Sequence, residues 1–522
     1  MISLRIRVHQ FLKVYSGTAA TIFVLALITY NYSDHIPIWD GGWYMKYLQS
    51  ALDSPFRPIA YATGHSAFSF FGYYAIFSKL APNSIWPLHL ASFLLVSMSS
   101  IYFGRVLKLL LPKLSIIENN LIVASLIFQP IVLGNLLNPT PDLVMFCLII
   151  PFFYFLFKNR EVHHLLTGTL MIFTKGTATI FYAISALTYL RLFGNGKATL
   201  RKIILLATPI IIYLWWQFFA SSTFPEQKNS WQFLFDDYKS GTFFRPLRVS
   251  NLVFSLLLIG SFNWLALLTI AARLIQRVRT SRSTSNPRLP DNFLKLESFF
   301  LVILLIGMAT LSIHMRNTNA RYVLIFLPIY IIIFSNSLFS LIPNFRHRVG
   351  FLVIYFSLIF VSAFRTIDPI SRWKFGLLQF GQHQLLKVNG PKSTMNRDSL
   401  IYNLEYLQLS KLQNQLFSRL QPMDRELIFS SEMVNFHFQT PIDQTSGIRQ
   451  LRRGPNTFDF SYRSVNELKN NVDLPEKIFF VIFPNFASKN SILEIKKFYK
   501  ELGNETIAHN GYEIQLLTFK KI

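Results

Sequence analysis

The sequence predicts a polytopic, all-α integral membrane protein that ends in a small α/β domain. Of its 522 residues, 51% are apolar and only 15% are charged, whereas soluble proteins carry about 25% charged residues. The apolar residues gather in long runs separated by short basic loops, which is the pattern of membrane-spanning helices. From residue 368 onward shorter strand-like and helical segments follow. We therefore predict a membrane domain over 1–367 and an extracytoplasmic domain over 368–522.

The net positive charge is better explained by a membrane than by nucleic acid. The 51 Lys and Arg outnumber the 26 Asp and Glu, but the basic residues lie between apolar runs, where they set topology and contact anionic lipid headgroups. We expect membrane lipids, and no nucleic acid, as partners. The single cysteine, Cys147, cannot form an intrachain disulfide and does not indicate a redox compartment. The first apolar run, 19–30, lacks a small-residue cleavage site and is predicted to be an anchor.

About eleven spans are predicted, with the N-terminus inside and the C-terminal domain outside, most simply in a bacterial inner membrane. Every predicted inner loop is short and basic, and the most basic one covers 273–288. The run 165–192 is too long for one unstrained span, so we predict two short spans that meet at an external Lys175; one tilted helix that buries Lys175 is the alternative. The expected spans are 17–30, 88–111, 121–137, 143–157, 165–192 (as two), 203–220, 252–272, 299–313, 323–341 and 349–364.

A lone carboxylate, Asp40, lies between Trp39 and Trp43 just after the first span. Partial desolvation at the membrane surface is expected to raise the pKa of this carboxyl group toward a value useful to a general base. An acid that caps a helix beginning at Gly41 is the alternative. The loop around it, 31–86, has the aromatic, amphipathic composition of interfacial helices, for example at 68–80.

Four further polar residues interrupt apolar sequence on the predicted outer side. Asp142 follows a Pro-rich turn. It either forms a two-acid site together with Asp40, with or without a metal ion, or is simply an acid that the helix dipole favours at the start of a helix. Lys175 requires an anionic partner or a route to water, which a substrate phosphate or a salt bridge to Asp142 or Asp40 would supply. Arg321 would either bind a substrate phosphate or extend its charged group from the end of a span to the membrane surface. His65 would bind a substrate hydroxyl or a metal, or is structural.

Four short segments keep a fixed order on this outer side: Trp39-Asp40-Gly41-Gly42-Trp43-Tyr44, Pro141-Asp142, Phe173-Thr174-Lys175-Gly176, and Ala320-Arg321-Tyr322 to Pro328. In order and topology they resemble the GT-C glycosyltransferases, polytopic enzymes that use polyprenyl-phosphate sugars. The chain is most similar to the aminoarabinose and protein-mannosyl transferases (family 39/83-type) over residues 20–340. Two departures stand out. The first is that Gly41 follows Asp40, where those members often carry Asp-Glu; in this respect the sequence is nearer the phosphatidylinositol mannosyltransferases. The second is that His65 is not followed by the Pro-Pro that follows it in the family.

The resemblance implies a direct inverting displacement on the extracytoplasmic side. Asp40 would take the proton of an acceptor hydroxyl, and Lys175, with Arg321, would stabilise the departing polyprenyl phosphate. Asp142 would orient the acceptor or a metal, and Tyr44 and His65 would contact substrate. The acceptor is a glycan, a lipid or a protein. No cofactor is required by the sequence, and a divalent cation, if one is used, would bind Asp40 and Asp142.

Two other classes fit parts of the sequence, namely a lipid-linked oligosaccharide flippase or other transporter, and a noncatalytic membrane subunit. Transporters commonly show repeated halves, and no internal repeat is found. No Walker loop or GxGxxG is present either, which argues against a nucleotide-driven reaction. The C-terminal domain is predicted to contain an interfacial segment (370–386), helices over 398–420 and 490–502, strands over 427–430 and 478–483, and a hairpin at Asn510-Gly511 within 506–519.

Overall fold

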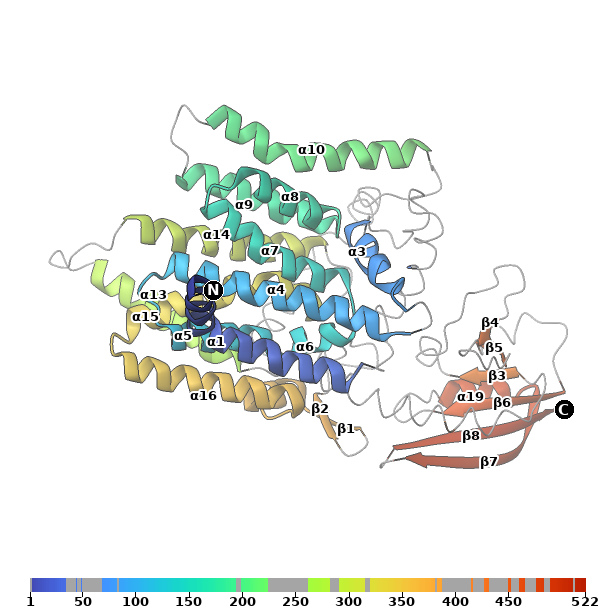
Figure 1. The fold of residues 1–522 in the computed structure, drawn as a ribbon. Helices are drawn as coiled ribbons and strands as arrows, with labels where there is room; N and C mark the ends of the chain where they lie inside the picture. The colour runs from blue at the N-terminus through green and yellow to red at the C-terminus, as the bar shows by residue number, and fades with distance from the viewer. Residues whose placement is uncertain are drawn as a thin grey trace.

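A computed structural model shows a bundle of apolar helices with a smaller region of strands beyond one end of it (Figure 1). The structure describes residues 2–33, 44, 48, 68–81, 84–193, 199–223, 262–281, 291–314, 320–380, 383–386, 415, 427–430, 449–451, 460–464, 476–482, 489–509 and 512–522. The helices are α1 (Ile2–Asn31), α3 (Phe68–Ser78), α4 (Trp86–Leu110), α5 (Ile116–Ile127), α6 (Pro130–Leu137), α7 (Pro141–Phe157), α8 (Glu161–Ile172), α9 (Thr177–Phe193), α10 (Thr199–Thr223), α13 (Asn263–Ser281), α14 (Asp291–His314), η3 (Ala320–Phe326), α15 (Leu327–Leu341), α16 (Phe345–Phe364), α17 (Pro369–Phe375) and α19 (Lys489–Ile495).

Most of the predicted apolar runs form these helices. Of the run 252–272 the structure describes only 262–272, and α13 continues to Ser281, into the loop predicted over 273–288. Within the described residues three helical stretches are long and apolar enough to cross a membrane: Trp86–Leu110, Arg321–Leu341 and Phe345–Phe364. The pair α5 and α6, bent by 57°, makes a fourth if it is counted as one span, and shorter apolar helices include Pro141–Phe157 and Thr177–Phe193. The chain is therefore an integral membrane protein, and the number of eleven spans stays a prediction.

The predicted break at Lys175 is confirmed. The run that was too long for one span divides into α8 and α9, which lie on either side of Thr174–Gly176. The two helices pack closely where Gly168 meets Tyr182, because a Cβ built on Gly168 would lie 2.4 Å from the tyrosine ring. Lys175 itself is buried rather than open to water, and the residues that surround it form the site described below.

Two ion pairs join helix ends that the predicted topology places on the same side. Arg277 near the end of α13 bonds Glu297 near the start of α14 at 3.3 Å. Arg348 in the first turn of α16 bonds Glu118 in the first turn of α5 at 2.7 Å. All four residues belong to the predicted inner side, which gives the bundle a basic end opposite the end that carries Asp142.

A buried carboxylate, Asp368, joins the start of α13 to the start of α17. Its Oδ2 accepts a hydrogen bond from the backbone N–H of Phe262 at 2.9 Å, and its Oδ1 accepts one from the indole N–H of Trp264 at 3.2 Å. The same Oδ1 caps α17 by accepting from the N–H groups of Ile370 and Ser371. Phe262 has a φ of 54°, a backbone conformation that non-glycine residues seldom adopt, so these bonds hold an otherwise unfavourable turn.

Asp368→Ala is expected to lower the free energy of unfolding by about 3 kcal/mol, because a helix cap and several bonds to a charged acceptor are lost together. The measurement is the apparent melting temperature of the purified protein in detergent. Asp368→Asn is the control, since asparagine caps helices as well as aspartate does, and less than half of the loss is expected. An unchanged melting temperature for Asp368→Ala would contradict this role.

The C-terminal region contains the predicted strands and hairpin. A six-stranded mixed sheet has the order β4-β5-β3-β6-β8-β7, with β3 parallel to β5 and to β6. Strand β3 and the β7–β8 hairpin occur where the sequence predicts them. The strands are β1 (Leu377–Phe380), β2 (His383–Leu386), β3 (Leu427–Ser430), β4 (Arg449–Leu451), β5 (Phe460–Ser464), β6 (Lys477–Ile482), β7 (Tyr499–His509) and β8 (Tyr512–Lys521).

Other predictions for this region fare differently. The helix expected over 490–502 is too long, because α19 ends at Ile495 and Tyr499 already pairs with Lys521 as the first residue of β7. Tyr499 is buried in the core under the sheet, so tertiary pairing overrides local helix propensity. The helix expected over 398–420 lies outside the described residues except for Gln415. The segment 370–386 forms α17 and the β1–β2 hairpin, and the domain boundary at 367/368 stays a prediction.

Candidate functional site

Three polar residues predicted on the outer side come together from three separate elements. Asp142 is in the first turn of α7, directly after Pro141, and both residue types are favoured at a helix start. Lys175 lies in the break between α8 and α9, and Arg321 lies in η3, just before α15. The Pro-rich turn, the helix break and the 3-10 turn thus bring one acid and two bases to one point.

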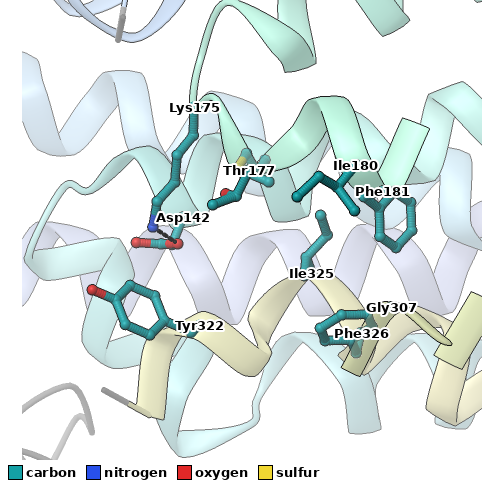
Figure 2. A pocket seen from close by; sticks show the side chains of 10 residues that line it. Asp142, Lys175, Thr177, Ile180, Phe181, Gly307, Tyr322, Ile325 and Phe326 are labelled. Atoms are coloured by element: carbon teal, nitrogen blue, oxygen red, sulfur yellow. Dashed lines mark hydrogen bonds and ion pairs between the residues drawn. The ribbon is translucent and has the colours of Figure 1, made fainter. Parts of the chain in front are cut away.

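A single carboxylate forms ion pairs with both cations. The ammonium Nζ of Lys175 donates to Oδ1 of Asp142 at 2.6 Å, and the guanidinium Nε of Arg321 lies 3.0 Å from Oδ2. The side chains of Asp142, Lys175 and Arg321 are only 7%, 6% and 4% exposed. Figure 2 shows Lys175 reaching from its turn to the Asp142 carboxylate. Each charge is therefore shielded from water and held by its partner.

An aromatic residue, Tyr322, completes this cluster. The centre of its ring is 4.3 Å from Nζ of Lys175 and 5.4 Å from the guanidinium carbon of Arg321. Aromatic faces attract cations at such distances, more strongly where water is excluded. Tyr322 was not among the residues proposed from sequence. The available signal was its position directly after Arg321 in a segment that begins a predicted span.

Asp142, Lys175 and Tyr322 form one wall of a partly open recess of about 410 Å³. Arg321 pairs with Asp142 from behind this wall and is not among the residues that line the recess. Thr177 adds a hydroxyl to the polar side. Gly307 lets the apolar side close tightly, because a Cβ at that position would come within 2.7 Å of the Phe326 ring. In Figure 2 the apolar side chains lie to one side of the Lys175–Asp142 pair. The apolar residues that line the recess are Met145, Ile180, Phe181, Gly307, Ile325 and Phe326.

The charges of this site favour an anion. Among the described residues, two cations face one carboxylate, which leaves one positive charge in excess there, in a place where electrostatic interactions are stronger than in water. A group that carries one negative charge would balance it. Because the apolar wall adjoins the charged one, the recess suits an amphipathic ligand with an anionic group next to a hydrocarbon chain.

Of the other predicted site residues, only Tyr44 belongs to the described part of the chain. Asp40 and His65 lie outside the described residues. Tyr44 is buried, and its ring packs edge-on against Phe70 and Phe71 of α3, with centres 5.3 and 6.3 Å away. It is not among the described residues that line the recess. The structure therefore brings together Asp142, Lys175 and Arg321. The roles of Asp40, Tyr44 and His65 stay predictions.

The donor set around Asp142 does not fit a divalent cation in this arrangement. Both carboxylate oxygens face Lys175 and Arg321, and a metal ion at the same oxygens would be repelled by these two charges. Within the described part of the chain, no three His, Cys, Asp or Glu side chains are grouped closely enough to hold a metal ion.

Comparison with known proteins shows a shared fold. No protein-family model and no curated protein matches the sequence. Two solved structures match over nearly the whole chain, both of ArnT from Cupriavidus metallidurans. The form bound to undecaprenyl phosphate has a TM-score of 0.52 at 12% identity, and the apo form has a TM-score of 0.53 at 10% identity. Both matches cover 96% of this chain and 98% of ArnT. The fold that the sequence resemblance implied is thus confirmed.

Proposed function

We propose that this protein is a membrane glycosyltransferase of the GT-C type that transfers a sugar from a polyprenyl-phosphate donor. The observation that carries the proposal is the Asp142–Lys175–Arg321 cluster beside an apolar wall. A polyprenyl-phosphate sugar has the matching form, a phosphate diester next to a hydrocarbon chain. The shared fold with ArnT, one structure of which holds undecaprenyl phosphate, supports the same donor class. The acceptor is a lipid, a glycan or a protein on the extracytoplasmic side.

The reaction is an inverting displacement at the anomeric carbon. Asp40 takes the proton of the acceptor hydroxyl while its oxygen attacks that carbon. The bond between this carbon and the phosphate oxygen breaks, and its electron pair stays on the phosphate. The phosphate thereby changes from a diester with one negative charge to a monoester with an additional one. Lys175 and Arg321 stabilise this added charge, so their interaction is stronger in the transition state than in the ground state.

Asp142 acts in this scheme as a positioning residue. Its two oxygens hold Lys175 and Arg321 at fixed places before the donor binds, and preorganised charges need no rearrangement when the reaction occurs. The ring of Tyr322 holds the ammonium group of Lys175 from another side. The carboxylate keeps the two cations oriented while the recess is empty. When the donor binds, its phosphate competes with the carboxylate for these cations, so the ion pairs do not prevent binding.

Asp40→Asn is expected to reduce transfer by about 10²–10⁴-fold, the usual contribution of a general base. The measurement is mass spectrometry of glycolipids and glycans from cells that lack the protein and are complemented with each variant. Asp53→Asn, which removes another carboxylate of the same external loop, is the matched control and should restore the product fully. A product level equal to wild type with well-expressed, folded Asp40→Asn would exclude Asp40 as the base.

A further inference from the structure

A second recess, of about 390 Å³, lies between the ends of α7, α8, α9 and α10. It adjoins the C-terminal end of α7, whereas Asp142 is in the first turn of the same 17-residue helix. Met145 of the first recess and Phe155 of the second are ten residues apart on this helix, which at 1.5 Å per residue separates the two linings by about 15 Å. The second recess therefore belongs to the opposite, basic end. Its polar lining consists of Asn159, Arg160, Glu161, His164 and Lys202.

Two cations of this recess have no charged partner. Arg160 precedes the first turn of α8 and Lys202 is in the first turn of α10. Neither side chain forms an ion pair within the described part of the chain, in contrast to Arg277 and Arg348 at the same end. Only one carboxylate, Glu161, lines the recess. An anionic ligand is thus favoured over a neutral or cationic one.

The floor of the recess contains a buried polar side chain. His164 is only 4% exposed, and its Nδ1 lies 3.4 Å from the carbonyl oxygen of Phe152. Because a carbonyl oxygen only accepts, Nδ1 carries the hydrogen. The other ring nitrogen, Nε2, is without a hydrogen-bond partner among the described residues. The hydroxyl of Tyr189 donates to Asn159 at 3.2 Å and fixes the adjoining polar wall.

The surroundings of the recess indicate that its ligand comes from the lipid bilayer. α10 lies at one edge of the bundle (Figure 1). Next to the recess, large apolar side chains point outward from both flanking helices, Val162 and Leu166 on α8 and Ile203 and Ile204 on α10. Leucine side chains of the same two helices also line the recess itself. A hydrocarbon chain can therefore lie along α8 and α10 while its headgroup reaches the cations.

We infer that this recess binds the phosphate group of an anionic membrane phospholipid, with Arg160 and Lys202 on the phosphate and the acyl chains between α8 and α10. The basic loops place this end at the inner leaflet. The site uses no residue of the Asp142 cluster, so it stands independently of the proposed reaction. A lipid held there stabilises the contact of α10 with α8 and α9 at the edge of the bundle.

The test is native mass spectrometry of the purified full chain with phosphatidylglycerol and with phosphatidylcholine of equal chain length. The wild-type protein should retain phosphatidylglycerol in preference. Arg160→Gln with Lys202→Gln should weaken that binding about 25-fold, from about fivefold for each cation near a membrane surface. Lys158→Gln with Arg191→Gln is the matched control, because it removes two cations from the same end that do not line the recess, and it should bind as wild type does.

Three results would overturn the inference. One is wild-type affinity for phosphatidylglycerol in Arg160→Gln with Lys202→Gln. Another is an equal loss in the control variant, which would indicate a diffuse effect of surface charge. The third is displacement of the lipid by soluble glycerol phosphate at equal concentration, which would assign the recess to a free phosphate. If the double variant does not fold, Lys202→Gln alone should show the fivefold loss.

Discussion

Lys175→Met should reduce sugar transfer by about 10²–10³-fold, the typical cost of removing one preorganised group that stabilises charge in a transition state. Methionine keeps an unbranched side chain of similar length but has no charge. The protein should still fold, because Asp142 keeps Arg321 as a partner at 3.0 Å and the remaining buried pair is neutral. The loss would therefore be one of activity rather than of stability.

The activity of Lys175→Met is measured as the glycolipid or glycan product in complemented cells, together with the melting temperature of the purified variant. Lys158→Met, an exposed lysine at the other end of α7, is the matched control and should be fully active. Lys175→Arg, which retains the charge but not the point-like ammonium group, should keep part of the activity. Full activity of a folded Lys175→Met protein would show that the ammonium group is only a structural partner of Asp142.

Asp142→Asn should have the largest effect on stability, about 3–5 kcal/mol, because it removes the charge of the carboxylate with which two buried cations pair. Transfer should be lost as well, since both cations lose the group that positions them. Asp142→Asn with Lys175→Met should melt at a higher temperature than Asp142→Asn alone, because only one buried cation then remains. A double-mutant cycle on these variants gives the coupling energy between the two residues, for which 0.5–3 kcal/mol is typical of residues in contact.

Thermal unfolding in detergent measures this series, with Glu297→Gln as the comparison. Glu297 is also a buried acid, but its partner Arg277 is 35% exposed, so water can solvate the cation that is left and a smaller loss is expected. If Asp142→Asn melts at the wild-type temperature, the two cations do not depend on the carboxylate, and the role of Asp142 as their holder is contradicted.

Much of the membrane domain could be predicted because local sequence decides it. Apolar runs and basic loops indicate helices and their ends, and a lone Lys175 in an apolar run marked the break between α8 and α9. The Asn-Gly turn signal likewise located the β7–β8 hairpin. The choice among partners for Lys175 could not be made in the same way. Asp142 is 33 residues away, and only packing decides that both residues reach one point.

The remaining differences have the same physical cause. The sequence places Tyr322 at the start of a predicted span but does not indicate its contact with Lys175. That contact depends on the fold, which brings the Lys175 ammonium group over the Tyr322 ring. The helix predicted over 490–502 ends early because Tyr499 gains a strand partner and a place in the core. Arg160 and Lys202 look like topology signals in sequence. Their shared recess follows only from the packing of α8, α9 and α10.

Binding of undecaprenyl phosphate shows whether Lys175 and Arg321 hold the phosphate of a polyprenyl lipid. The wild-type protein in detergent should melt at a higher temperature with undecaprenyl phosphate than with undecaprenol, which has the same chain but no phosphate. Lys175→Met and Arg321→Met should each lose most of this difference, while Arg160→Gln should keep it. Equal stabilisation by the alcohol, or an unchanged difference in both cluster variants, would contradict the account.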